Sequence, residues 1–167
     1  MSDRPANARL AAAGGIAVTL ALCGICGARV RSQSTADSVT FVGAGDIAVG
    51  SNMAPVRATA NLLDAIEGTV FTLGDHAYKH GDASEFKDCY GSTWGRHKAR
   101  TRPTIGNHNL ITGKGRPYFD YCGESAGPDR RGYYSFDLGA WHLVSLNSNV
   151  PIKNDSPQMK WLRQPLS

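Results

Sequence analysis

The sequence carries little net charge, few cysteines and no internal repeat. Its formal net charge is +4 over 167 residues, which is too mild to indicate nucleic-acid binding, because such proteins usually present a strongly basic surface. No repeat or low-complexity tract follows residue 28, and 41% hydrophobic with 19% charged residues argues against disorder. The length suffices for one globular domain, and we expect no nucleic-acid partner.

The first 28 residues are unlike the rest of the chain. Two arginines precede an uncharged stretch from Leu10 to Ala28 that ends on small residues, and a polar segment follows over 29–38. This pattern is typical of a secretory signal peptide. We expect a signal peptide over 1–28, a linker over 29–38, and a secreted or periplasmic domain over 39–167. The alternative is an uncleaved membrane anchor, because the apolar run approaches the roughly 20 residues that span a bilayer.

Only two of the four cysteines lie outside this leader. Cys23 and Cys26 form a C-x-x-C pair inside the apolar run, so they do not indicate a redox or zinc motif. Cys89 and Cys122 remain in the domain. An oxidising compartment is compatible with a disulfide between them, and two separate buried thiols are the alternative.

The start of the domain predicts a strand, a helix and a second strand. Val39–Ala44 and Thr69–Leu73 are nearly continuous apolar or β-branched runs, as expected of strands that are covered on both faces. Between them, Pro55–Gly68 has apolar residues at helical spacing, a proline in its first turn and a glycine at its end. This order predicts a right-handed parallel crossover.

The later elements complete a mixed α/β domain. The sequence predicts a helix around 83–90, a short strand at 104–105, a hairpin that turns over 137–140 with its second arm at Trp141–Leu146, and a final helix with Ser156 as N-cap and Pro157 in its first turn.

Polar side chains follow three of the expected strands. Each group begins after a glycine, in the segments GAGDIA, LGDHAY and IGNHN. Ligands bind at the carboxyl ends of strands in open α/β sheets, and carboxylate, phenol and amide oxygens suit hard metal ions such as Fe(III), Mn, Mg or Zn. The candidate site residues are Asp46, Asp75, Tyr78, Asn107 and His108.

The first of these segments also has an alternative interpretation. FVGAGDIAVG contains the G-x-G-x-x-A spacing of a dinucleotide-binding turn, which would indicate an oxidoreductase with bound NAD or FAD. In that fold a helix begins at the second glycine and presents its N-terminus to the pyrophosphate. Here Gly50 and Pro55 interrupt the segment, and Asp46 would repel the anion. We therefore rank this interpretation last.

The three segments resemble the calcineurin-like metallophosphoesterases. The family's blocks run G-D-x-[HG], G-D-x-x-[YD] and G-N-H-[DE], followed by a lone His and by G-H-x-H, and this chain has GDIA, GDHAY and GNHN. Tyr78 lies three residues after Asp75, and position 48 is not His. Both features are similar to the purple acid phosphatase branch, and the resemblance covers nearly all of residues 39–167.

The resemblance implies a fold, a reaction and a role for each site residue. The fold would be a four-layer αββα sandwich with mixed sheets, and a dinuclear metal centre would activate water for attack on a small phosphorylated substrate. Asp46 and Tyr78 would hold one ion, Asp75 would bridge both, and Asn107 would bind the second. The ions would be Fe paired with Zn, Mn or Fe. His108 would be the catalytic residue that hydrogen-bonds the phosphate or protonates the leaving alcohol.

The chain also departs from the family pattern. Asn109 replaces the acid that usually follows the histidine. His76 is an unusual neighbour of Asp75, and we expect the His76 side chain to lie behind the ligands or at the surface. The basic residues from Arg96 to Arg102 either form a solvated face or attract phosphate.

The lone His and G-H-x-H blocks do not occur before Ser167, and the four candidate ligands do not complete two metal ions. We therefore expect a fragment in which the C-terminal part of the sandwich is missing. The alternative is a non-catalytic binding module or a degenerate phosphatase.

Overall fold

The computed structural model describes residues 38–164. The expected signal peptide and nearly all of the linker lie outside the described residues. Within the described part of the chain, none of the helices combines the length and apolar character that a membrane crossing requires.

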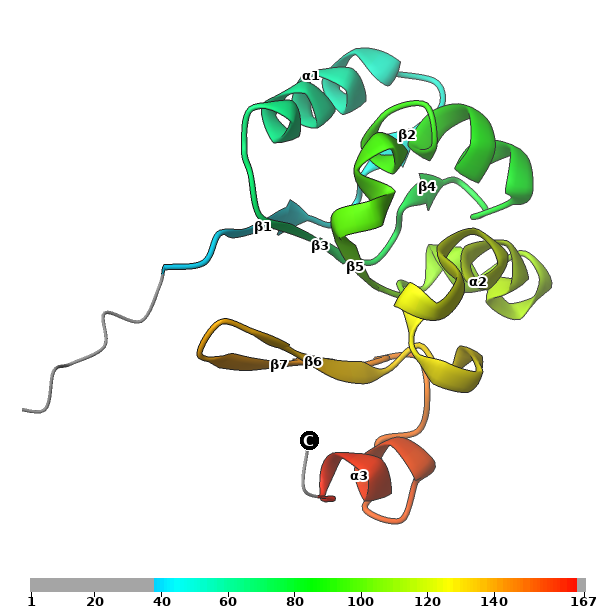
Figure 1. Cartoon of the computed structure of the whole chain (residues 1–167). Coiled ribbons are helices and arrows are strands. Elements are labelled where there is room, and N and C mark those ends of the chain that lie inside the picture. The colour runs from blue at the N-terminus through cyan, green and yellow to red at the C-terminus, as the bar shows by residue number, and fades with distance from the viewer. Residues whose placement is uncertain (1–37, 165–167) are drawn as a thin grey trace, which may run out of the picture. The chain divides into compact units, whose positions relative to one another are not determined.

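A three-stranded parallel sheet forms the centre of the domain. It contains β1 (Phe41–Ala44), β3 (Thr69–Leu73) and β5 (Thr101–Thr104) in the order β1-β3-β5. Ala44 pairs with Thr72, and Leu73 pairs with Thr104, so the three strands end at one edge. Because β3 has a hydrogen-bonded neighbour on each side, it is the central strand (Figure 1).

The expected crossover is present between β1 and β3. Its helix, α1 (Met53–Asp64), begins two residues earlier than predicted and ends four residues earlier. Two short strands, β2 (Ala48–Val49) and β4 (Ala77–Tyr78), follow β1 and β3 respectively and form a separate parallel pair. This pair holds the segments after Asp46 and Asp75 side by side.

Alternation along β3 gives the sheet two different faces. Val70 and Thr72 are fully buried on the face that carries the main core. Its other members come from α1 and from the helical segments after β4 and β5, and include Val56, Ala60, Leu63, Phe86, Tyr90, Trp94, Tyr118 and Phe119. Those segments are η1 (Glu85–Tyr90), η2 (Trp94–Arg100), η3 (His108–Leu110), η4 (Gly113–Gly115), α2 (Arg116–Cys122), η5 (Gly123–Ala126) and η6 (Pro128–Arg130).

The second face of the sheet contacts a β-hairpin. Strands β6 (Tyr134–Leu138) and β7 (Trp141–Ser145) are antiparallel. The ring centroids of Phe41 and Phe136 lie 6.2 Å apart, and the hydroxyls of Thr104 and Ser145 are hydrogen-bonded at 2.7 Å. After the hairpin, α3 (Pro157–Leu162) places the ring centroid of Trp161 5.1 Å from that of Tyr133, the residue just before β6.

The structure confirms a mixed α/β fold with parallel and antiparallel sheets, and it changes several details. The third strand covers Thr101–Thr104 instead of 104–105, and α2 was not predicted. The hairpin and the final helix are where the sequence places them. Ser156 precedes that helix but makes no side-chain capping bond, and its hydroxyl is buried without a hydrogen-bond partner in the described residues.

No disulfide joins Cys89 to Cys122; both are free thiols. The thiol of Cys89 lies close to Gly50, whereas Cys122 is buried in the core and lines a small cavity together with Tyr121 and Lys98. The two sulfur atoms are thus in separate environments. Burial raises the pKa of the Cys122 thiol to about 12, so this side chain behaves as a small apolar core residue.

Candidate functional site

The three polar segments lie at the carboxyl ends of the parallel strands. The segment after β1 carries Asp46, the segment after β3 carries Asp75 and Tyr78, and the segment after β5 carries Asn107 and His108. The registers of the strands bring these ends to one edge of the sheet, as expected for a parallel arrangement.

Both aspartates adopt left-handed backbone conformations. Their φ angles are 54° for Asp46 and 50° for Asp75, a region that aspartate enters more readily than most residues but at a cost of about 1 kcal/mol or more. Backbone hydrogen bonds hold the turns: the N–H of Asp46 donates to Gly74 at 3.3 Å, and the N–H of Ile47 donates to Asp75 at 3.0 Å. The backbones of the two aspartates are therefore fixed relative to each other.

Gly106 lets the third segment approach Asp75. A Cβ atom at this position would lie 2.2 Å from Oδ1 of Asp75 and 2.4 Å from its backbone nitrogen, which is closer than any real Cβ contact. Only glycine therefore permits this contact between the ends of β3 and β5.

The phenol of Tyr78 joins the two carboxylates. Its oxygen is within hydrogen-bond distance of Oδ1 of Asp46, and it lies 3.1 Å from Oδ2 of Asp75. A phenol has one proton and can donate it to one carboxylate at a time. Three hard oxygen ligands converge here, with Asp46 exposed and Asp75 buried, and this donor set suits a hard cation.

The surroundings disfavour the phenolate form of Tyr78. Burial raises the pKa of this phenol well above its usual value, and the hydrogen bonds to Asp46 and Asp75 raise it further. The phenol therefore stays neutral at physiological pH unless a cation binds among these oxygens, since a bound cation favours the anionic form of its ligands.

His108 is held beside this group by its backbone and its ring. Its N–H donates to Oδ1 of Asp75 at 2.8 Å. Nδ1 donates to the carbonyl of Lys79 at 2.8 Å, and because a carbonyl only accepts, Nδ1 carries the hydrogen. The ring centroid lies 4.6 Å from that of Tyr78. Nε2 is thus the nitrogen that is left for another partner.

Asn107 is the one predicted site residue whose side chain does not join the others. It is exposed, and its backbone carbonyl accepts a hydrogen bond from Leu110 at 3.1 Å. Within residues 38–164 its amide makes no hydrogen bond. The structure therefore brings together Asp46, Asp75, Tyr78 and His108, and it leaves the Asn107 side chain in solvent one residue away.

Two residues behind the site form a buried polar connection. His76 and Asn109 are fully buried, and Oδ1 of Asn109 accepts from Nδ1 of His76 at 3.0 Å and from the N–H of Asp75 at 3.0 Å. The imidazole that Asn109 binds belongs to His76 and not to His108, the histidine that precedes it. A pattern of strand ends could not have shown which neighbour of Asp75 points inward.

A second group of ionisable side chains, His80, Asp82 and Glu85, lies after β4. The Asp82 carboxylate accepts from the N–H of Glu85 at 2.9 Å, and the Glu85 carboxylate accepts from the N–H groups of Lys79, His80 and Asp82. This reciprocal arrangement is a capping box. Its carboxylate oxygens are occupied by backbone donors, so the group is explained by local folding.

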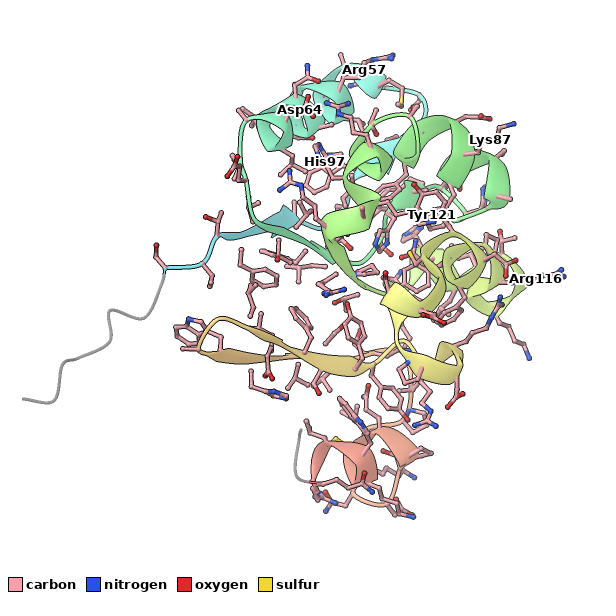
Figure 2. All side chains as sticks on the ribbon, viewed as in Figure 1. Arg57, Asp64, Lys87, His97, Arg116 and Tyr121 are labelled. Atoms are coloured by element: carbon pink, nitrogen blue, oxygen red, sulfur yellow. The ribbon has the colours of Figure 1, made fainter. Side chains whose placement is uncertain are left out.

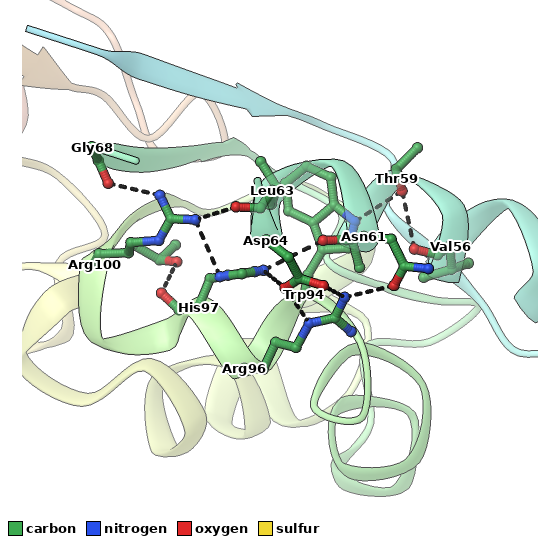
Figure 3. Close-up of polar contacts among 12 residues, drawn as sticks. Val56, Thr59, Asn61, Leu63, Asp64, Gly68, Trp94, Arg96, His97 and Arg100 are labelled. Atoms are coloured by element: carbon green, nitrogen blue, oxygen red, sulfur yellow. Dashed lines mark hydrogen bonds and ion pairs between the residues drawn. The ribbon is translucent and has the colours of Figure 1, made fainter. Parts of the chain in front are cut away.

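The basic segment Arg96–Arg102 is largely engaged in packing. Arg96 donates two hydrogen bonds to the Asp64 carboxylate, and His97 lies 3.1 Å from the same carboxylate (Figure 3). Figure 2 shows Asp64 on α1 next to His97 on η2. Lys98 lies over the ring of Tyr121, and Arg102 lies over the ring of Phe136. The segment therefore joins η2 to α1 and the sheet to the hairpin.

The sequence matches no protein-family model, and a search of curated proteins found no relative.

Proposed function

We propose that this chain carries the metal site of a phosphoesterase similar to the calcineurin-like metallophosphoesterases, in their purple acid phosphatase branch. The observation that carries the proposal is the convergence of the Asp46 and Asp75 carboxylates on the phenol of Tyr78, with His108 beside it. We further propose that the β1-β3-β5 sheet and the β6–β7 hairpin correspond to the two sheets of the four-layer sandwich.

The donor set fits a hard metal ion. Asp46, Asp75 and Tyr78 would hold the first ion, and Asp75 with Asn107 would contribute to a second. When bound, such ions lower the pKa of a water molecule and offset the negative charge of a phosphate group. The three oxygens suit a hard ion, and the resemblance to the purple acid phosphatase branch implies Fe(III) with Fe, Zn or Mn as the partner ion.

The role of His108 follows from its two nitrogens. Nδ1 is bound to the Lys79 carbonyl, so only Nε2 can contact a substrate. From there it can hydrogen-bond a phosphate oxygen or donate a proton to the oxygen of the leaving alcohol. Contact with the Tyr78 ring and the bond to Lys79 limit rotation of the imidazole. The substrate class is a small phosphorylated molecule.

The test combines metal content, absorption and hydrolysis. The purified full chain, loaded with Fe and Zn or with Mn, is analysed for bound metal and assayed with p-nitrophenyl phosphate. Asp75→Asn is expected to weaken metal binding by about 100-fold or more, because removal of even an outer partner of a metal ligand costs about 10-fold to 100-fold. His108→Ala is expected to retain the metal and lose about 100-fold or more in turnover, because a general acid contributes on that order.

A matched control and one spectroscopic signature complete the experiment. Glu67→Gln removes an exposed carboxylate just before β3, at the end of that strand opposite the site, and it should leave metal binding and turnover unchanged. A visible charge-transfer band from phenolate to Fe(III) should be present in the unmodified chain and absent in Tyr78→Phe. Failure of the unmodified chain to bind any of these metals would overturn the proposal. Metal uptake without hydrolysis would overturn its catalytic part and favour a non-catalytic binding module.

A further inference from the structure

The imidazole of His76 is fully buried directly behind Asp75, and both of its nitrogens are hydrogen-bonded. Nε2 lies 2.6 Å from the hydroxyl oxygen of Thr72, and Nδ1 lies 3.0 Å from Oδ1 of Asn109. A side chain with no exposed surface and no free nitrogen cannot be a metal ligand. It also does more than fill space in the core, because Nε2 contacts Thr72 on β3 and Nδ1 contacts Asn109 in the segment after β5.

The partners of Asn109 determine where the protons lie. Its Oδ1 accepts hydrogen bonds from the backbone N–H groups of Asp75 at 3.0 Å and Gly106 at 3.1 Å. These two obligatory donors identify the atom as the oxygen. Nδ1 of His76 must therefore also be a donor, and Nε2 accepts from the Thr72 hydroxyl. The neutral ring has one tautomer, with its hydrogen on Nδ1.

One oxygen atom thus connects the ends of two strands. Asn109 Oδ1 binds the backbone of Asp75 after β3 and the backbone of Gly106 after β5, and the N–H of His108 in turn binds Oδ1 of the Asp75 carboxylate at 2.8 Å. Oδ2 is the Asp75 oxygen that faces Tyr78. The orientation of this carboxylate therefore depends on the position of the Asn109 side chain.

We propose that His76 is a positioning residue that acts through Asn109 to hold Asp75 in its ligand orientation. This inference rests on the proposed metal site. A requirement for stability alone would not favour the arrangement, because the Asn109 Nδ2 group is buried with no hydrogen-bond partner in the described residues, and a buried donor without an acceptor is unfavourable.

Two substitutions at His76 separate the roles of its nitrogens. In His76→Asn the side-chain amide nitrogen can replace Nδ1 as the donor to Asn109, and the contact with Thr72 is lost. In His76→Gln the longer amide reaches toward Thr72, and the donor to Asn109 is lost. Thr72→Val removes the partner of Nε2 and leaves the connection to Asn109 intact.

The experiment measures the affinity of the full chain for Zn²⁺ and Mn²⁺ by chelator competition, after circular dichroism has established equal folded fractions. His76→Gln should bind about 10-fold to 100-fold more weakly, the range found when the partner of a metal ligand is removed. His76→Asn should stay within about threefold of the unmodified chain, and Thr72→Val should keep its affinity while its unfolding midpoint falls. Equal affinities for the Asn and Gln variants would overturn the inference.

A measurement on the unmodified chain covers the case in which a variant does not fold. Long-range ¹H–¹⁵N correlation of the His76 ring should show the hydrogen on Nδ1, and a hydrogen on Nε2 would contradict the inference. If the unmodified chain binds metal, Asp75→Asn binds it about 100-fold or more weakly, and His76→Gln binds it normally, only this inference fails. If the unmodified chain binds no metal, the proposed function and this inference fail together.

Discussion

At the scale of single residues, Asp75 and His76 are sequence neighbours with opposite environments. Asp75 directs its carboxylate to Tyr78, whereas His76 directs its imidazole into the core against the rings of Phe86, Tyr90 and Tyr118. A strand that ends in a left-handed turn can separate adjacent side chains in this way. Two consecutive residues, Asp75 and His76, therefore connect the candidate site to the hydrophobic core.

The buried imidazole should make stability depend on pH. Burial lowers the pKa of His76 from 6.5 to about 4, although the hydrogen bond to Asn109 and the Asp75 carboxylate oppose the shift. The unfolded chain then binds a proton at higher pH than the folded chain does. The stabilisation is fully present above about pH 6.5 and is lost as the pH falls through 4. The total loss is about 3 kcal/mol.

Urea unfolding between pH 4 and pH 8 measures this dependence, with His76→Asn as the comparison. The variant has no imidazole at this position, so its stability should change less over the same interval. Equal slopes for the two proteins would contradict the assignment of the effect to His76.

The sequence allowed part of the candidate site to be predicted. Polar residues after parallel strands had to meet at one edge, and Asp46, Asp75, Tyr78 and His108 do so. The metal and its role stay predictions. The inward direction of His76 depends on the left-handed turn at Asp75, and the solvent exposure of Asn107 depends on the packing of the segment after β5. The spacing of the strands in the sequence predicts neither feature.

At the scale of elements, Arg100 on η2 contacts the carbonyls at the end of α1. The Arg100 guanidinium donates to the carbonyls of Leu63 at 2.6 Å and Gly68 at 2.8 Å (Figure 3). The final carbonyls of a helix have no intrahelical donors, and a cation there also interacts favourably with the helix dipole. Arg100 therefore stabilises the end of α1 and the start of β3 together.

Loss of this contact should destabilise the domain measurably. Arg100→Met is expected to lower the free energy of unfolding by about 2 kcal/mol, because two hydrogen bonds from a charged group to backbone carbonyls are lost. Arg96→Ala, which breaks a more exposed pair with Asp64, should cost less than about 1 kcal/mol. Denaturant titration measures both.

Arg57 provides the control for these substitutions. It lies on the outer surface of α1 (Figure 2), and Arg57→Ala should change stability by less than about 0.5 kcal/mol. A loss at Arg57 as large as the loss at Arg100 would show that general charge effects, and not the carbonyl contacts, determine stability.

Element boundaries were predictable where the hydrophobic pattern is continuous. β3 has the predicted limits because five apolar or β-branched residues stand between turn residues. β5 was placed three residues too late, since Arg102 and Pro103 do not resemble a central strand, and in the structure β5 pairs only with β3 among the described strands. α2 follows two glycines with positive φ angles, Gly113 and Gly115. Because glycines indicate a turn or loop, the start of this helix was not predicted.

At the scale of the whole described domain, the β1-β3-β5 sheet divides two layers of unequal packing. The face with Val70 and Thr72 is fully covered, whereas Leu73 on the other face is 67% exposed despite the hairpin. Trp141 on β7 is 66% exposed. The hairpin therefore adds less buried apolar surface than α1 and the helical segments do.

Hydrogen exchange should reveal this difference. Amides of β3 are expected to exchange at least about tenfold more slowly than those of β6 and β7, because β3 is bonded on both sides and lies over the better-packed core. Native-state exchange followed by NMR measures each amide. Equal protection of β3 and the hairpin would mean that the two layers open as one cooperative unit.

The unpartnered nitrogen of Asn109 also bears on how this sequence can evolve. Asparagine and aspartate have nearly the same shape, and their codons differ by one nucleotide. Replacement of that nitrogen by oxygen would remove the unsatisfied donor, set a carboxylate against the His76 ring and favour its protonated form. A single mutational step could thus convert a neutral support of Asp75 into an ion pair without repacking the core.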